Sequence, residues 1–430
     1  MRILLLSYYF PHINVVSSDR TFSWAECLSK YHSITVVTRH FANGQKGSWS
    51  QLLVQDQSEI EIKKGERYDV HYLPSKRHSL YQFKYMSAPT GILSSLSHLF
   101  LNATGNLNSE SDAHRSFYRY AERLCSQNKY DLIIVSSPPL NMIKLGAYLS
   151  SKFRIKLQVD MRDLWHNDEL KEHMSLPLNV RILNSIKRYY VHRWIQQADL
   201  ITTVSEPIAE FIHKFSGKKC STIRNGFNEQ LYANKNEIRK FNAFSILFSG
   251  TYYPAQDLSI FSNGFNLFYQ RLENASSVNV ILLGVNSIPL VSHRLKSNLP
   301  TDVIIEYERK TTTEAALIAM QSHVIVHCGW KGYKGIYTTK LFDFIASGAN
   351  LMIAPGDGNV MDETVLSTNT GVIANSAEEV CDWLYQWYQV WVSNGSLESN
   401  RNEELIAQYS RTHQAERLKA IIDTEINNGN

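Results

Sequence analysis

GIYTTKLFDFIASG, residues 335–348, reads as a glycine-opened turn that runs into a short amphipathic helix. Thr338 and Thr339 are good caps for a helix that begins near Lys340, and the open N–H groups at such a helix start favour an anion. Lys340 and Asp343 are three residues apart and project from one side of the helix. This spacing lets an ammonium meet a phosphate while a carboxylate accepts hydrogen bonds from a neighbouring ribose diol.

The composition predicts an α/β protein with two domains. A chain of 430 residues, 43% hydrophobic and 20% charged, is long enough to bury two ordinary cores. Its five cysteines show no CxxC pair and no histidine at metal-site spacing, so we expect a reduced compartment and no structural zinc. No run of 18 apolar residues occurs, and Ile3–Leu6 is too short for the apolar core of a signal peptide.

Basic residues are concentrated in the first half of the chain. Residues 1–219 hold 28 lysines and arginines against 19 acidic residues, whereas residues 220–430 hold 16 against 21. We therefore expect the first half to be drawn to an anionic partner. No recognition helix, zinc finger or RNA-binding aromatic pattern accompanies the charge, so nucleic acid is not expected. An acidic membrane surface or a lipid diphosphate fits better.

The N-terminal half alternates between buried strands and helices. RILLLSYYF (residues 2–10) and ITVVTRH (residues 34–40) read as parallel strands, with a helix between them, and so predict a βαβ unit of a Rossmann-like sheet. The loop before that helix lacks GxGxxG and holds Ser18 and Arg20 instead, which disfavours a nicotinamide cofactor. Arg20 suits either two hydrogen bonds to a phosphate or an ordinary salt bridge.

Two basic segments interrupt or extend this pattern. Residues 76–100 mix basic heads with aromatic and aliphatic groups, as a segment at a membrane interface does. The alternative is that this segment is an insertion that packs against its own domain. Residues 178–197 predict a basic amphipathic helix, for which a solvated face is the ordinary explanation.

A cluster of charges ends the predicted strand at KLQVDMRDLW, residues 156–165. Charged groups at a strand end are costly to bury without partners. Asp163 is our candidate for a carboxylate in the ligand cleft, and Asp160 and Arg162 form a candidate supporting pair. The alternative is a structural ion-pair network beneath a loop.

The second half opens a further α/β domain. FSILFSGTYYPAQDLSIF, residues 244–261, reads as a strand, a turn at Gly250 and a helix. The polar stretch 228–242 is the natural linker between the two domains. We expect an N-terminal domain over 1–228 and a second domain that begins at residue 229.

The 335–348 stretch, the DxRDxW run at residues 160–165 and the Asn225–Gly226 turn together resemble the retaining family-4 glycosyltransferases with the GT-B fold. The resembling segments together cover most of the chain. Among them, KLFDFIASG is similar to the corresponding sequence in the enzymes of this family that build bacterial cell-surface polysaccharides. The resemblance implies two Rossmann-like domains that face each other across a cleft. It also implies a C-terminal helix over 403–430 that crosses back to the first domain, so that the second domain spans 229–402. It also implies sugar transfer with retention from a nucleotide diphosphate to a lipid-linked saccharide, on the cytoplasmic face of the membrane, without a metal or other cofactor.

The resemblance assigns roles to individual residues. The donor-binding residues are Gly250, Thr251, Gly335, Ile336, Tyr337, Thr338, Thr339, Lys340 and Asp343. The catalytic candidates are Asp163 and Lys340, and the acceptor or cleft candidates are Ser18, Arg20, Asp160 and Arg162.

The chain departs from the family pattern at two places. Gly335 stands where the family carries the first of two acids, and Tyr252 and Gln256–Asp257 stand where relatives bind the diphosphate with arginine and lysine. We therefore expect Lys340 and backbone amides to carry more of the phosphate charge, with Lys331 or Lys334 in reserve. These departures keep two alternatives open, which are a nucleotide-sugar epimerase of the same fold and a catalytically silent GT-B partner protein.

Overall fold

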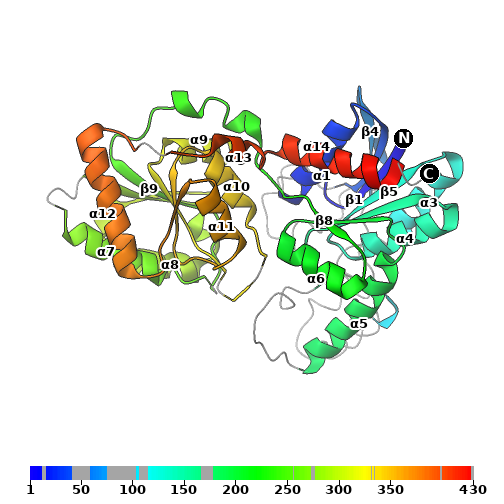
Figure 1. Cartoon of the computed structure of the whole chain (residues 1–430), viewed down its shortest axis with the longest axis horizontal. Helices are drawn as coiled ribbons and strands as arrows, with labels where there is room; N and C mark the ends of the chain where they lie inside the picture. The colour runs from blue at the N-terminus through cyan, green and yellow to red at the C-terminus, as the bar shows by residue number, and fades with distance from the viewer. Residues whose placement is uncertain are drawn as a thin grey trace. The chain divides into compact units, whose positions relative to one another are not determined.

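The computed structural model describes residues 1–11, 16–40, 59–74, 103–105, 115–165, 178–254, 256–272, 277–330, 332–333, 335–397 and 400–427. The chain divides into two compact units, and Figure 1 labels many of their helices and strands. Unit 1 comprises Met1–Arg224 and Gln414–Asn430, and unit 2 comprises Asn225–His413. The domain limits that we expect from the sequence stay a prediction.

The described part of unit 1 contains a sheet with the strand order β3-β4-β2-β1-β5-β6-β7-β8. Its strands are β1 (Arg2–Ser7), β2 (Ser33–Arg39), β3 (Glu61–Lys64), β4 (Tyr68–Leu73), β5 (Leu132–Ser137), β6 (Lys156–Met161), β7 (Leu200–Thr203) and β8 (Cys220–Thr222). Its helices are α1 (Val16–Leu28), α3 (Arg115–Gln127), α4 (Asn141–Phe153), α5 (Leu178–Ile195), α6 (Glu206–Ser216) and α14 (Arg411–Ile422), which continues as a π-helix over Asp423–Asn427. Each neighbouring pair of strands is parallel except β3 and β4.

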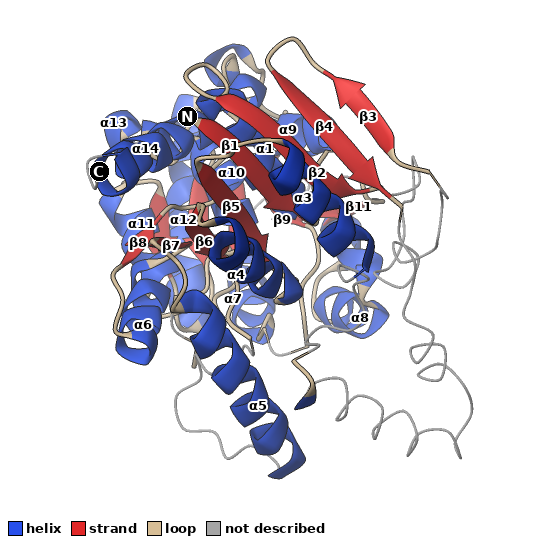
Figure 2. Ribbon diagram, turned by 90° about the vertical axis from the view of Figure 1, so that its right-hand side faces the viewer, coloured by secondary structure: helices blue, strands red, loops and turns tan. Residues whose placement is uncertain are grey.

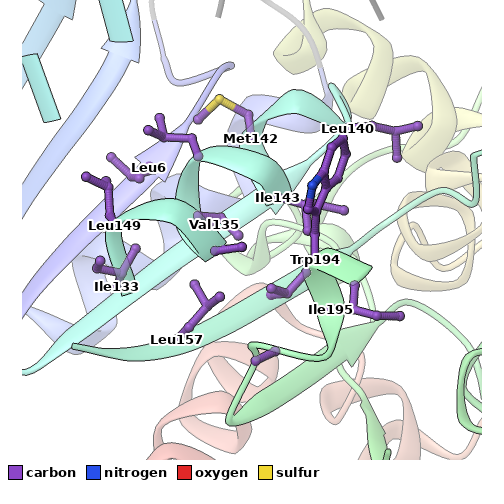
Figure 3. Packing of buried hydrophobic residues seen from close by; sticks show 14 of the residues in the cluster. Leu6, Ile133, Val135, Leu140, Met142, Ile143, Leu149, Leu157, Trp194 and Ile195 are labelled. Carbon is purple, nitrogen blue, oxygen red and sulfur yellow. The ribbon is translucent and has the colours of Figure 1, made fainter. Parts of the chain in front are cut away.

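Helices cover both faces of the unit 1 sheet (Figure 2). On one face, Ile133 and Leu157 of the sheet pack with Ile143 of α4 and Trp194 of α5 (Figure 3). On the other face, α1 and α14 cover the sheet. Every residue of β5 is buried because the strand lies between these two layers, which explains its continuous run of apolar residues.

The described part of unit 2 contains a parallel sheet with the strand order β11-β10-β9-β12-β13-β14. Its strands are β9 (Phe244–Ser249), β10 (Val278–Leu283), β11 (Ile304–Tyr307), β12 (Val324–His327), β13 (Asn350–Ile353) and β14 (Gly371–Ile373). One face carries α7 (Ser259–Gln270), α8 (Pro289–Ser297) and α12 (Ala377–Asn394). The other carries α9 (Thr312–Gln321), α10 (Thr339–Ala346), α11 (Val360–Ser367) and α13 (Glu403–Ala407).

The carboxyl ends of three neighbouring strands in unit 2 are joined by backbone hydrogen bonds. The N–H of Gly250, after β9, donates to the carbonyl of Leu283 at 2.7 Å. The N–H of Gly284, after β10, donates in turn to the carbonyl of Tyr307 at 2.9 Å. The loops that follow β9, β10 and β11 therefore start side by side, at the edge where open parallel sheets bind ligands.

The C-terminal helix belongs to unit 1, as the sequence predicts. Ala415, Leu418 and Ile422 of α14 are fully buried in one cluster with Trp24 and Leu28 of α1. The prediction of two Rossmann-like domains is confirmed as well, because both units carry a parallel sheet between helices.

The C-terminal helix expected over residues 403–430 is interrupted. The N–H of Phe227 donates to the carbonyl of Tyr409, and the N–H of Arg411 donates to the carbonyl of Phe227. These two bonds make Ser410 the bridge partner of Phe227, between the end of α13 and the start of α14, so the two are separate helices.

Some expectations concern residues outside the described ranges. These are the segment 76–100 and the reserve cations Lys331 and Lys334. Within the described ranges, no helix has the length and hydrophobicity needed to cross a bilayer.

Candidate functional site

Lys340 reaches from α10 to the turn that ends β9. Gly250 has a φ of 90°, and a Cβ at this position would overlap the Nζ of Lys340. Only glycine therefore leaves room for the ammonium here, and the Nζ donates a hydrogen bond to the carbonyl of Ser249 at 3.2 Å. The cation is thus held at the carboxyl edge of the unit 2 sheet.

Two causes depress the pKa of this lysine. Burial, and then the positive charge of Arg309, lower the pKa of Lys340 to about 8, while Asp343 opposes them. An ammonium that is poorly solvated and repelled by a second cation gains more from an anionic ligand than a lysine in water does. The surroundings of Lys340 therefore favour the binding of an anion.

His327 supports the start of α10 and was missed in the sequence. It ends β12, and its Nε2 lies 2.7 Å from the Oγ1 of Thr338. Burial and the nearby Lys340 lower the pKa of His327 to about 3, so the ring is neutral at physiological pH. The threonine hydroxyl is consequently engaged by the histidine and does not cap α10. The sequence offered one indication of this role, which was a histidine at the end of a predicted buried strand.

The turn before α10 is tied to α11. Gly335 has a φ of 75°, and its N–H donates to the Oδ1 of Asn359 at 2.9 Å. A positive φ disfavours residues with a Cβ, which accounts for glycine at the place of the family's first acid. The hydroxyl of Tyr337 lies 3.1 Å from that of Thr364, so this tyrosine fixes the turn. Ile336 and Thr339 are half-buried beside it.

Asp343 is half-buried on the first turns of α10. It accepts a hydrogen bond from Tyr232, and its charge adds to burial in raising the pKa of that tyrosine. A carboxylate offers about four acceptor positions. Asp343 can therefore hold Tyr232 and still accept from a ligand hydroxyl.

Polar side chains of the loop after Gly250 donate hydrogen bonds to backbone carbonyls. Tyr252 donates to the carbonyl of Val326 at 2.9 Å, and the Nε2 of Gln256 donates to the carbonyl of Cys328 at 2.8 Å. These residues stand where the resemblance places a diphosphate-binding arginine and lysine. Here they anchor the loop to the end of β12, and Thr251 of the same loop is half-buried.

In unit 1, Arg20 and Asp160 form a buried structural pair. The Nη2 and Nε of Arg20 donate to the two carboxylate oxygens of Asp160 at 2.8 and 3.1 Å. Ser136 and Thr202 also donate to this carboxylate, while the Nη1 of Arg20 donates to the carbonyls of residues 223 and 224. Both side chains are at most 2% exposed.

This network bears on two expectations from the sequence. Asp160 takes its ion pair from Arg20, whereas the sequence suggested Arg162. Of the two alternatives left open for Arg20, a phosphate contact and a salt bridge, the structure has the salt bridge, and Ser18 is buried as well.

Asp163 lies apart from this network and is exposed. The neighbouring Arg162 is half-buried; burial lowers its pKa, and the charges of Asp163 and Asp160 oppose that effect. Asp163 is thus the carboxylate of the DxRDxW run that solvent and ligands can reach.

Among the described residues, no group of three His, Cys, Asp or Glu side chains forms a metal site.

Solved structures resemble the whole chain. Anabaena HepE in complex with UDP and glucose is 13% identical, with 99% of this chain and 100% of that chain covered and a TM-score of 0.57. Sucrose-phosphate synthase from Thermosynechococcus elongatus is 12% identical over 100% and 97% of the two chains, with a TM-score of 0.55. The UDP-forming trehalose-phosphate synthase from Burkholderia xenovorans is 9% identical over 98% and 100%, with a TM-score of 0.61.

The chain has the GT-B glycosyltransferase fold. At these identities the likeness shows the fold alone, and it confirms the fold that the sequence resemblance implied. No protein-family model matches the sequence, and no curated protein matches it either.

The two aspartates of the DxRDxW run should respond differently to amidation. We expect Asp160→Asn to lower the free energy of unfolding by about 3–5 kcal/mol, because it leaves Arg20 as a buried charge without its carboxylate. Asp163→Asn is the matched control and should change stability by less than about 0.5 kcal/mol. Urea denaturation of both variants measures the difference, and equal stabilities would refute a structural role for the buried pair.

Proposed function

We propose that the protein is a retaining glycosyltransferase that moves a sugar from a nucleoside diphosphate to a lipid-linked saccharide in bacterial surface polysaccharide synthesis. The observation that carries the proposal is the ammonium of Lys340, held against Gly250 at the carboxyl edge of the unit 2 sheet. Asp343 lies one turn further along the same helix, at a spacing that suits a ribose beside a diphosphate. The Anabaena HepE structures with UDP and with UDP-glucose make UDP the first ligand to test.

The proposed chemistry is electrostatic. As the glycosidic bond breaks, negative charge gathers on the leaving diphosphate, and fixed cations and N–H groups stabilise that charge most strongly where solvent is excluded. Lys340 and the amides at the start of α10 supply this stabilisation. The acceptor hydroxyl attacks the anomeric carbon from the face that the diphosphate leaves, and its proton passes to the departing phosphate. Asp163 orients the sugar or the acceptor and forms no covalent bond.

A catalytically silent GT-B partner protein is the second candidate. It is favoured by Tyr252 and Gln256, whose polar groups are engaged by the backbone at the places of the diphosphate-binding pair. Slow hydrolysis of a nucleotide sugar without acceptor would count against this candidate.

An epimerase of the same fold would convert the donor sugar with no acceptor present, and product analysis separates it from a transferase.

Lys340 and Asp343 should contribute differently to ligand binding. We expect Lys340→Ala to weaken UDP binding by about 1.5–3 kcal/mol and to leave uridine binding almost unchanged, because it removes a charge-assisted contact to phosphate. Asp343→Asn should weaken both ligands and abolish the preference for ribose over 2′,3′-dideoxyribose. Its new amide oxygen still accepts from Tyr232, so the fold should survive. Isothermal titration calorimetry measures these affinities. An equal loss of affinity for all ligands would show that the turn has only a structural role.

Asp163 should affect turnover more than donor affinity. With a nucleotide sugar labelled in its sugar and a lipid-linked saccharide as acceptor, we expect the protein to transfer label to the lipid. Asp163→Asn should reduce the rate at saturating donor and keep the affinity for UDP, since Lys340 and Asp343 are intact. A variant with full turnover would remove Asp163 from the proposed mechanism.

We further propose that the protein works on an anionic membrane surface. Leu178, Ile182 and Tyr189 of α5 are 71%, 48% and 61% exposed and recur at helical spacing. Arg181 and Arg193 are exposed on the same helix, which contains no acidic residue. Apolar side chains flanked by cations suit a helix that lies at a lipid interface.

Vesicle sedimentation tests this interface. We expect the protein to bind acidic vesicles and to be released by salt, and the double variant Arg181→Ala with Arg193→Ala to bind about 30-fold more weakly, at about 1 kcal/mol per cation. The control pair Lys156→Ala with Lys214→Ala removes two cations that face acidic neighbours and should bind nearly as the wild type does. Equal binding to neutral and acidic vesicles would contradict the proposal.

A further inference from the structure

Arg309 lies on the loop that follows β11, at the same sheet edge as Lys340. Its Cα is 3.5 Å from the position that a Cβ on Gly284 would take. Gly284 is hydrogen-bonded to Tyr307, and Gly250 is hydrogen-bonded to Leu283. The loop after β11, which carries Arg309, and the loop after β9, which Lys340 contacts, are therefore separated only by the end of β10. The two cations therefore belong to one cluster.

The charges of these two residues act on each other directly. Arg309 is exposed, and its charge lowers the pKa of Lys340. Among the described residues no ion pair involves Arg309, whereas the adjacent Lys310 lies 3.8 Å from Glu314. Two cations that repel each other across a sheet edge are stabilised by a ligand with more than one negative charge.

The described residues of the loop beside Gly250 supply no cation for a second phosphate. Tyr252 and Gln256 occupy the loop beside Gly250, and both use their polar groups on the backbone of residues 326 and 328. A diphosphate spreads its charge over two groups, and a guanidinium can bind one of them with two hydrogen bonds.

We infer that Arg309 binds the diphosphate of the donor together with Lys340, and so replaces the arginine and lysine that are missing after Gly250. This inference rests on the proposed function and names a further residue of the same site. Arg309 contacts the phosphate that Lys340 leaves uncovered, and the ribose lies at Asp343 as in the proposed function.

Calorimetry with UDP, UMP and uridine tests the assignment. We expect Arg309→Ala to weaken UDP binding roughly 10- to 100-fold, UMP binding less, and uridine binding less than about 2-fold. Lys310→Ala, one residue away and paired with Glu314, is the matched control and should bind all three ligands as the wild type does. Arg309→Lys should recover part of the UDP affinity.

A pH series separates a direct electrostatic role from a structural one. In the wild type, the protonated Lys340 binds the diphosphate, so UDP affinity should fall as pH rises through about 8. Asp343 and the neutral His327 also face this ammonium and are unchanged in the variant. Without the repulsion from Arg309 the pKa of Lys340 rises, so in Arg309→Ala the fall should begin at higher pH.

Each outcome decides one statement. Equal losses for uridine and UDP, or no loss in Arg309→Ala, would overturn the assignment of Arg309 while leaving the proposed function intact. A wild-type protein that binds no nucleoside diphosphate under any condition would instead refute the proposed function.

Discussion

The close approach of the Lys340 ammonium to Gly250 is the constraint on which the rest of the candidate site depends. It requires a turn without a Cβ at the end of β9, and it requires α10 to begin opposite that turn. Tyr252 and Gln256 hold the loop after the glycine against β12, and His327 holds the residue before α10. Three elements that are far apart in the sequence are therefore positioned around a single cation.

The two units treat a buried cation in opposite ways. In unit 1, Arg20 is matched by a carboxylate with which it makes two hydrogen bonds and by two backbone carbonyls, so its charge is satisfied within the fold. In unit 2, Lys340 donates to a backbone carbonyl and lies near another cation, with Asp343 as the opposing charge. A fully matched ion pair stabilises structure, whereas an incompletely neutralised cation at a sheet edge retains affinity for an anion that arrives from solvent.

The sequence predicted those features that depend on local pattern. The buried apolar run that begins at Arg2 is a strand, and the glycine before Lys340 lies in a turn. The return of the C-terminal helix to unit 1 was implied by the family resemblance. Features that depend on distant partners were not predicted. The partner of Asp160 is 140 residues away, and the break between α13 and α14 follows from pairing with Phe227. Arg309 likewise joins the cluster only because β10 and β11 pair in the register that the sheet adopts. Spacing along the chain carries no information on such pairings.

The place of α14 has a consequence for how the protein is made. Its apolar face completes a core cluster with α1, yet the roughly 190 residues of unit 2 separate Arg224 from Gln414. At about 5–20 residues per second, a ribosome needs on the order of 10–40 seconds to synthesise them. Throughout this interval the surface formed by Trp24 and Leu28 lacks its cover. Unit 1 therefore cannot complete the cover of its second face until α14 has been synthesised, and during that time the nascent chain presents an apolar surface that a chaperone can shield.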